Sequence, residues 1–122
     1  MKRDWEAIRN ILIAVEDMGP NQYLTLHDFV DSEEFPHAAI AYNAELLRSA
    51  GLVEGHNVST LGPEQNDFSI TSLTWEGHEL FDAIRTDTIW NKTKESFVKA
   101  GASMTFELVK SVAIKAAQDL LT

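Results

Sequence analysis

The sequence predicts a small α+β protein that is mostly helical. Its 122 residues are enough for one domain, or for one domain with an appendage. We expect a winged-helix-like core at residues 1–85, with a small antiparallel β-hairpin as its wing, and a two-helix C-terminal extension at residues 86–122. Two observations predict this fold. The expected elements follow the order helix, short strand, helix and hairpin, and the composition (44% hydrophobic, 24% charged) is typical of a globular chain.

Apolar residues at helical spacing predict the first helix, from about Asp4 to Asp17. They share one face of the helical repeat: Trp5, Ile8, Ile11, Leu12 and Val15. Asp4 is a natural N-cap, and Gly19–Pro20 ends the helix. The next residues, Tyr23–Leu26, alternate and favour β structure, so we expect a short strand there.

The second helix is expected from Pro36 to Ala50, where it would be the recognition helix of a winged fold. Asp31–Glu34 supplies a cap and acidic side chains for the first turn, and Pro36 suits the first helical position. Gly51 fits the left-handed position after the helix. The extra helix that winged helices carry before this one must fit between residues 26 and 35, so it is short or absent.

A hairpin follows the second helix. Leu52–Val53 begins its first strand, and the turn-rich stretch Gly55–Asp67 is the predicted wing. Phe68–Leu73 alternates again, so we expect it to return as the second strand.

Two further helices precede the last one. Thr74 is expected to cap a helix that carries Trp75, and a second helix runs from about residue 87 to residue 100, where Gly101 ends it. Because of their helical spacing, Trp75 and Trp90 are expected in the core.

The last helix is capped by Ser103 or Thr105 and runs to the end of the sequence. Five of its apolar side chains share a face: Val109, Val112, Ala113, Ala116 and Leu120. Small alanines permit close helix packing. We therefore expect the extension either to pack on the core or to form a homodimer through its helices.

The placement of charge is more informative than the net charge of −9. Between residues 10 and 84 the chain carries thirteen acidic residues and one basic residue, Arg48, which gives this stretch a formal charge of −12. The remaining residues carry +3. The central body is therefore expected to repel polyanions.

Several kinds of chemistry are disfavoured. The chain has no cysteine, which excludes disulfides, cysteine-based zinc sites and thiol chemistry. Its four histidines lie far apart, and it has no nucleophile elbow, phosphate-binding loop or dinucleotide fingerprint. We expect no catalytic residue, no metal and no cofactor, hence a protein that is not an enzyme. The chain also shows no secretory signal and no apolar run of membrane-spanning length, so we expect a cytoplasmic protein without a membrane partner.

DNA binding is the alternative function that the predicted fold suggests. The recognition helix has only Arg48 and the wing has no lysine or arginine, so neither offers the phosphate contacts such modules need. Three polar side chains of the helix could contact base edges, but we interpret them as ordinary surface residues: His37, Tyr42 and Asn43. In this alternative, a winged-helix transcription regulator contacts DNA through its basic terminal segments. The candidate residues are Arg48, Lys92, Lys94 and Lys99.

Protein recognition is the function that the charge favours. An acidic surface steers association toward a basic partner. We therefore expect a non-enzymatic interaction or regulatory protein that binds another protein, one that is basic and associated with nucleic acid. The candidate contact residues are acids of the wing, its surroundings and the start of the recognition helix: Glu33, Glu34, Glu54, Glu64 and Asp67.

The chain resembles a bacterial and phage family known as domain of unknown function 2513. The matching pieces are Met1–Asp4, Leu47–Gly55, Leu73–Glu79, Asp82–Arg85 and Asp87–Lys94 (DTIWNKTK), of which the last is the most specific. The resemblance implies a winged-helix-like core and an origin in phages, prophages or their bacterial hosts. It implies no activity, because the family has none assigned.

Overall fold

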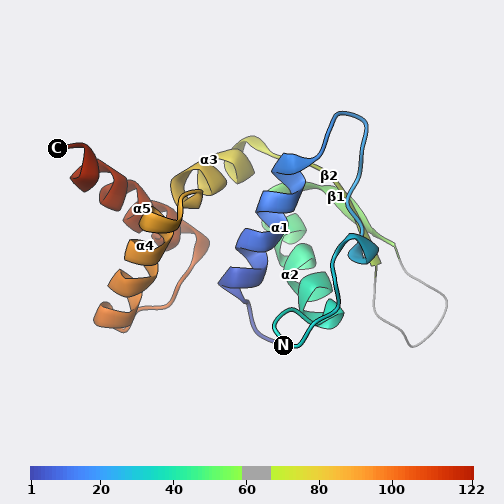
Figure 1. Cartoon of the computed structure of the whole chain (residues 1–122), viewed down its shortest axis with the longest axis horizontal. Helices are drawn as coiled ribbons and strands as arrows, with labels where there is room; N and C mark the ends of the chain where they lie inside the picture. Colours follow the sequence, from blue (N-terminus) through green and yellow to red (C-terminus); the bar gives the residue numbers. More distant parts are fainter. Residues whose placement is uncertain (59–66) are drawn as a thin grey trace. The chain divides into compact units, whose positions relative to one another are not determined.

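The computed structural model describes residues 1–58 and 67–122 (Figure 1). The chain divides into two compact units, Met1–Gly77 and His78–Thr122, and each is described by itself below. Among the described residues there are five α-helices and one two-stranded antiparallel sheet. The prediction of a mostly helical α+β chain is therefore confirmed.

Helix α1 (Trp5–Asp17) forms as predicted. The Asp4 carboxylate accepts hydrogen bonds from the backbone N–H groups of Glu6 (3.0 Å) and Ala7 (3.2 Å), which caps the helix. The apolar stripe that the sequence predicts is buried: Trp5, Ile8, Ile11, Leu12 and Val15.

The predicted strand Tyr23–Leu26 is wrong. Only an isolated bridge forms there, in which Leu24 and Ile70 exchange backbone hydrogen bonds of 2.8 and 3.0 Å. The chain then turns into a short 3₁₀ helix, η1 (Leu26–Asp28). The Asp28 carboxylate accepts from the Thr25 backbone N–H at 2.8 Å, and such local side-chain bonds compete with strand pairing.

Helix α2 (His37–Ser49) is one residue shorter at each end than predicted. Pro36 is its cap residue, and the Asp31 carboxylate accepts from the His37 backbone N–H at 2.9 Å. The first turn contains no acidic residue, so the prediction for Glu33 and Glu34 is wrong: both lie in the exposed bend before the helix. Gly51 has the expected left-handed conformation, with φ of 75°.

Strands β1 (Val53–Val58) and β2 (Asp67–Leu73) form the antiparallel hairpin. The predicted turn begins too early, because residues 55–58 belong to β1. The register shifts between Glu54 and Gly55, where the strands approach so closely that a Cβ on Gly55 would overlap the Ser69 carbonyl oxygen. Only glycine fits this bulge.

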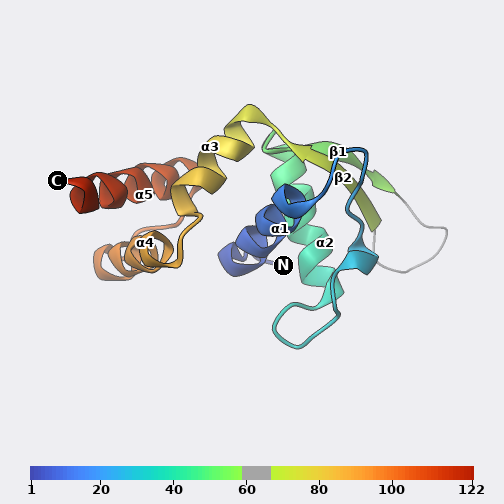
Figure 2. The same cartoon turned by 45° about the horizontal axis from the view of Figure 1, so that its top comes forward.

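The core of the first unit lies between its two helices and its hairpin. Helix α1 contacts α2 and β2, and α2 contacts both strands (Figure 2). Helix α2 contributes four buried side chains to this core: Ile40, Asn43, Ala44 and Leu47. Asn43 is a polar side chain in this core. Its Oδ1 accepts from the Asp4 backbone N–H at 2.9 Å, and its Nδ2 donates to the Ala39 carbonyl at 2.8 Å, so both of its polar atoms have partners.

Helix α3 (Trp75–Ile84) begins in the first unit and continues into the second. Thr74 caps it as predicted, because its hydroxyl accepts from the Gly77 backbone N–H at 3.0 Å. The prediction that Trp75 belongs to the core is wrong, since this side chain is 77% exposed. The physical reason is its position on the first turn, where helical spacing alone does not decide which face is covered.

The second unit contains helices α4 (Asp87–Ala100) and α5 (Phe106–Leu121), which contact each other. Gly101 ends α4 in a left-handed conformation, and Thr105 caps α5. Trp90 is buried as predicted. The predicted apolar face of α5 is buried only in part: Val109 and Ala113 are buried, whereas Leu120 is 51% exposed.

Candidate interaction surfaces

Trp75 is the large aromatic side chain that the first unit leaves most open to solvent in its described part. The backbone around it is held firmly. The Thr74 hydroxyl donates to the Gly51 carbonyl at 2.7 Å while it accepts from Gly77, and the Thr74 N–H donates to the Leu52 carbonyl at 3.1 Å. The exposed indole therefore projects from a fixed joint between the turn after α2 and the start of α3.

Gly77 makes this joint tight. A Cβ at Gly77 would overlap the Leu52 carbonyl oxygen, so the first turn of α3 can approach the α2–β1 turn only with glycine there. These contacts fix the backbone that carries Trp75, so the chain at this position has little conformational entropy left to lose if the exposed indole contacts another molecule.

Acidic side chains lie at the same junction as Trp75. Glu76 follows it on α3 and is exposed, and Glu54 is exposed on β1, where it pairs in register with Ser72, two residues before Thr74. We call Trp75, Glu54 and Glu76 the junction surface. The first unit as a whole has thirteen acidic and four basic residues and a formal charge of −9, whereas the second unit has six of each and is neutral.

The other acids predicted to contact a partner lie elsewhere in the first unit. Glu33 and Glu34 precede α2, whereas Glu54 follows it, and the ends of a helix of 13 residues are about 20 Å apart. The Asp67 carboxylate accepts from the backbone N–H groups of Leu26 (3.0 Å) and Phe68 (2.7 Å), so it links η1 to β2. Glu64 lies outside the described residues. The described acids thus do not form one patch.

Three polar residues of α2 that were considered for DNA contact have bonding partners within the first unit. Asn43 is fully buried, so the interpretation of this residue as a surface side chain is wrong. His37 Nε2 lies 2.6 Å from the Phe29 carbonyl oxygen. The Arg48 guanidinium binds both carboxylate oxygens of Glu45, at 2.8 and 2.5 Å. This bond to Arg48 lowers the pKa of Glu45 below its ordinary value.

The lysines predicted for DNA contact do not act alike. Lys94 lies over the Trp90 ring, with its Nζ 5.3 Å from the ring centroid. Lys99 Nζ lies 2.8 Å from Glu95 Oε1, and this hydrogen bond lowers the pKa of Glu95 and raises that of Lys99. Lys92 and Lys99 both line a groove between α4 and α5, whereas Lys94 does not.

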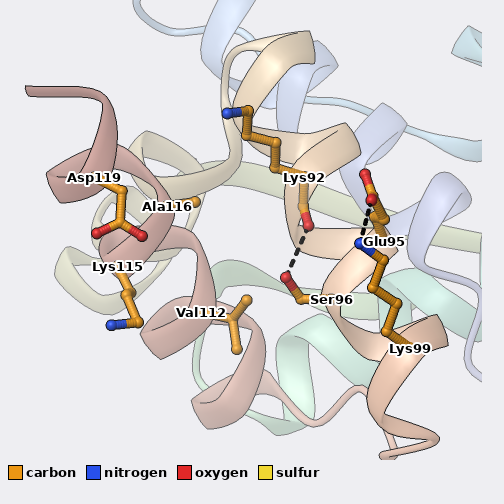
Figure 3. Close-up of a pocket in the computed structure, with 8 residues that line it drawn as sticks. All are labelled: Lys92, Glu95, Ser96, Lys99, Val112, Lys115, Ala116 and Asp119. Carbon is orange, nitrogen blue, oxygen red and sulfur yellow. Dashed lines mark hydrogen bonds and ion pairs between the residues drawn. The ribbon is translucent and has the colours of Figure 1, made fainter.

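This α4–α5 groove has a volume of about 500 Å³ (Figure 3). Its lining combines an apolar part with side chains of both charges: Lys92, Glu95, Ser96, Lys99, Val112, Lys115, Ala116 and Asp119. Lys115 and Asp119 were not among the residues predicted from the sequence. Their spacing of four residues places both on one face of α5, which is a signal that sequence alone offers, but not one that shows what the face contacts.

The structure offers neither a metal site nor a membrane span in its described part. Across residues 1–58 and 67–122, no group of three or more histidine and carboxylate side chains is placed to hold a metal ion. No helix in those ranges combines the length and apolar character needed to cross a bilayer.

Fold and surfaces together define a mostly helical α+β protein with an acidic first unit and a neutral helical second unit. Residues 2–103 match the family model described as "Hypothetical protein (DUF2513)", and the chain belongs to this family, as its sequence motifs indicated. It is also 36% identical to a Haemophilus influenzae protein named "Uncharacterized protein", over 115 residues that cover 93% of this chain and 92% of the relative. No solved structure matches the chain significantly.

Proposed function

We propose that this chain is a non-enzymatic interaction or regulatory protein that binds a basic protein through its acidic first unit. The observation that carries the proposal is the junction surface, where the exposed Trp75 follows the hydrogen-bonded Thr74, Glu76 comes next on α3, and the exposed Glu54 pairs in register with Ser72. Tryptophan is enriched among the residues that dominate binding energy at protein interfaces. Its ring also attracts lysine and arginine side chains by cation–π contact.

The charge of the first unit supports the same class of partner. A unit with a formal charge of −9 attracts basic surfaces over a distance of about 10 Å at moderate salt. Basic surfaces are common on proteins that bind nucleic acids, so we propose a partner of this kind. A cytoplasmic location and a role in phage, prophage or host regulation complete the proposal, and they rest on the family membership and the composition.

The order of elements in the first unit supports a winged-helix-like core. Helix α1, the 3₁₀ turn η1, helix α2 and the β1–β2 hairpin follow one another as in that fold, with α2 in the place of the recognition helix. The single arginine of α2, Arg48, is engaged by Glu45, so this helix lacks a free cation for phosphate contact in its described structure. A winged-helix-like frame that binds protein instead of DNA fits these contacts.

Binding of a defined peptide tests the proposal. The probe is a fluorescently labelled lysine- and arginine-rich peptide, and an acidic peptide of equal length is the negative control. We expect the basic peptide to bind the full chain and to lose affinity steeply as salt is added, because screening weakens the attraction. Binding that is the same at low and high ionic strength would contradict the proposal.

Variants locate the binding surface. Trp75→Ala is expected to weaken the peptide about tenfold or more, a typical loss for an interface anchor. Tyr23→Ala is the matched control, because Tyr23 is an exposed aromatic residue of the same unit (64% exposed). Glu54→Lys with Glu76→Lys is expected to abolish binding, whereas Glu33→Lys at the other end of α2 is expected to have a smaller effect. Equal losses for Trp75→Ala and Tyr23→Ala would contradict the junction surface.

DNA binding through the second unit is the outcome that would favour the alternative function. A gel shift with duplex DNA at low salt tests it, and Lys92→Glu with Lys99→Glu shows whether the predicted lysines are responsible. We expect no retardation, because Lys99 is paired with Glu95 and the same groove carries Asp119. Retardation that these substitutions remove would support a DNA-binding regulator instead.

A further inference from the structure

The second unit carries many of the large apolar side chains that are exposed in the described residues. Five of the nine large apolar side chains that are exposed in the described residues belong to α4 and α5: Val98, Leu108, Ile114, Leu120 and Leu121. Helix α5 has 16 residues, all described, and only Val109 and Ala113 among them are buried. An amphipathic helix in a finished core normally buries a wider stripe. Much of α5 is therefore available for contact with another molecule.

The α4–α5 groove is a hollow on this unit with an apolar part and a charged rim. Val112 and Ala116 are half-buried and belong to α5. Lysines come from both helices, and one acid comes from each helix (Figure 3). Within residues 1–58 and 67–122, neither Lys115 nor Asp119 has an ion-pair partner within 4.0 Å, so both charges are free to pair with another chain.

We propose that the α4–α5 groove is a self-association surface, whose occupant is the same groove of a second copy of this chain. In a two-fold dimer the same patch lies on both sides of the interface, so a patch must complement itself. A patch of one charge sign fails this condition, whereas three lysines and two acids beside apolar side chains satisfy it. The second unit is formally neutral, so two copies of this unit do not repel each other through their net charge.

Other occupants fit the groove less well. A polyanion would meet Glu95 and Asp119 beside the lysines, and a strongly basic segment would meet Lys92, Lys99 and Lys115. The groove shares no residue with the junction surface and belongs to the other unit, so self-association and the proposed function can each fail without the other.

Analytical ultracentrifugation of the full chain tests the inference, with two charge-reversal variants. The acidic variant carries K92E, K99E and K115E, which leaves the groove with acids only. The basic variant carries E95K and D119K, which leaves it with lysines only. We expect the natural chain to dimerise and each variant to dimerise on the order of 100-fold more weakly, because like charges then meet across the two-fold axis.

Mixing the two variants is the decisive measurement. Opposite charges then face each other, so we expect a heterodimer where neither variant forms a homodimer. Lys110→Glu is the control for charge alone, since Lys110 does not line the groove, and it should dimerise like the natural chain. Circular dichroism confirms that each variant is folded.

Several results would overturn the inference. These are a natural chain that stays monomeric at every concentration, variants that dimerise like the natural chain, and a mixture that stays monomeric. DNA binding that the basic variant strengthens, together with a monomeric natural chain, would assign the groove to a polyanion instead.

Discussion

The two units of this chain differ in their charge, in the burial of their helices and in the sequence range of their contacts. The first unit surrounds a well-buried core with acidic side chains, and its contacts reach across the sequence, as in the bond from Asp4 to Asn43. The second unit is neutral, its buried polar contact is local, and much of its α5 helix stays exposed. Surfaces that differ in this way suit different kinds of contact, and we propose a basic partner for the first unit and a second copy of the chain for the second.

A leucine-to-alanine substitution in each unit should give the largest difference in the loss of unfolding free energy. Leu47 in α2 is fully buried, whereas Leu121 in α5 is 86% exposed. We expect Leu47→Ala to reduce the free energy of unfolding by about 3 kcal/mol, because it leaves a cavity. Leu121→Ala should cost less than about 0.5 kcal/mol. Urea denaturation followed by circular dichroism measures both, and similar losses would show that α5 is covered in solution.

Substitution of the buried polar residue in each unit should give the second largest difference in the loss of stability. In the described residues these are Asn43 and Thr93. Asn43→Ala is expected to cost about 2 kcal/mol, because the Asp4 N–H loses its acceptor. Thr93→Val should cost about 1 kcal/mol or less, because the Thr93 hydroxyl bonds only the Ile89 carbonyl of its own helix, at 2.7 Å, and valine has the same shape. A larger loss for Thr93→Val in the same denaturation experiment would contradict this ranking.

Replacing one left-handed glycine by alanine should cost the same stability in each unit. Gly51 and Gly101 have φ of 75° and 66°, and a Cβ added at either position would have no other atom within 4 Å. Alanine should therefore cost about 1 kcal/mol at each, from backbone strain alone. Thermal unfolding of Gly51→Ala and Gly101→Ala measures this, and a gain in stability at either position would show that its left-handed conformation is not kept in solution.

Lowering the pH should change the contribution of these two units' ion pairs to stability by the smallest amount. The pKa values of Glu45 and Glu95 are lowered by Arg48 and Lys99, so each ion pair stabilises the fold above the carboxylate's ordinary pKa of 4.5 and loses this contribution as the pH falls through the lowered value. The Glu95–Lys99 pair is exposed to solvent and the Glu45–Arg48 pair is partly exposed, which weakens both pairs. For Glu45→Gln we expect a decrease in Tm of about 1 °C at neutral pH that disappears in acid. A difference that grows in acid would contradict the sign.

Local signals explain which parts of the fold could be predicted. The caps Asp4 and Thr74 and the glycines Gly51 and Gly101 act within a few residues of the helices they bound, so the sequence alone places them correctly. For the last helix the sequence left Ser103 and Thr105 open, and the structure shows Thr105 as the cap. The strand expected at Tyr23–Leu26 failed for a related reason. Its β-favouring pattern competes with the Asp28 carboxylate, and only the folded chain shows which of the two prevails.

The interaction surfaces were harder to predict, because they depend on contacts between distant residues. The buried Asn43 side chain accepts a hydrogen bond from the backbone of Asp4, and the Asp67 carboxylate accepts one from the backbone of Leu26. Both partners are distant in the sequence. Trp75 looks like a core residue from helical spacing, since the sequence does not show which face of α3 is covered. Lys92 and Lys99 were predicted as candidate DNA contacts from their own helix, but the groove that they line also contains Lys115 and Asp119 from the next helix.

The positions of the three tryptophans have a practical consequence. Trp5 is buried in the first unit and Trp90 in the second, while Trp75 stands in solvent. A chain that keeps only one of the three would emit from a single known environment. A chain that keeps only Trp5 or only Trp90 would therefore report the melting of one unit, and a chain that keeps only Trp75 would report the arrival of a ligand at the junction surface as a change in emission.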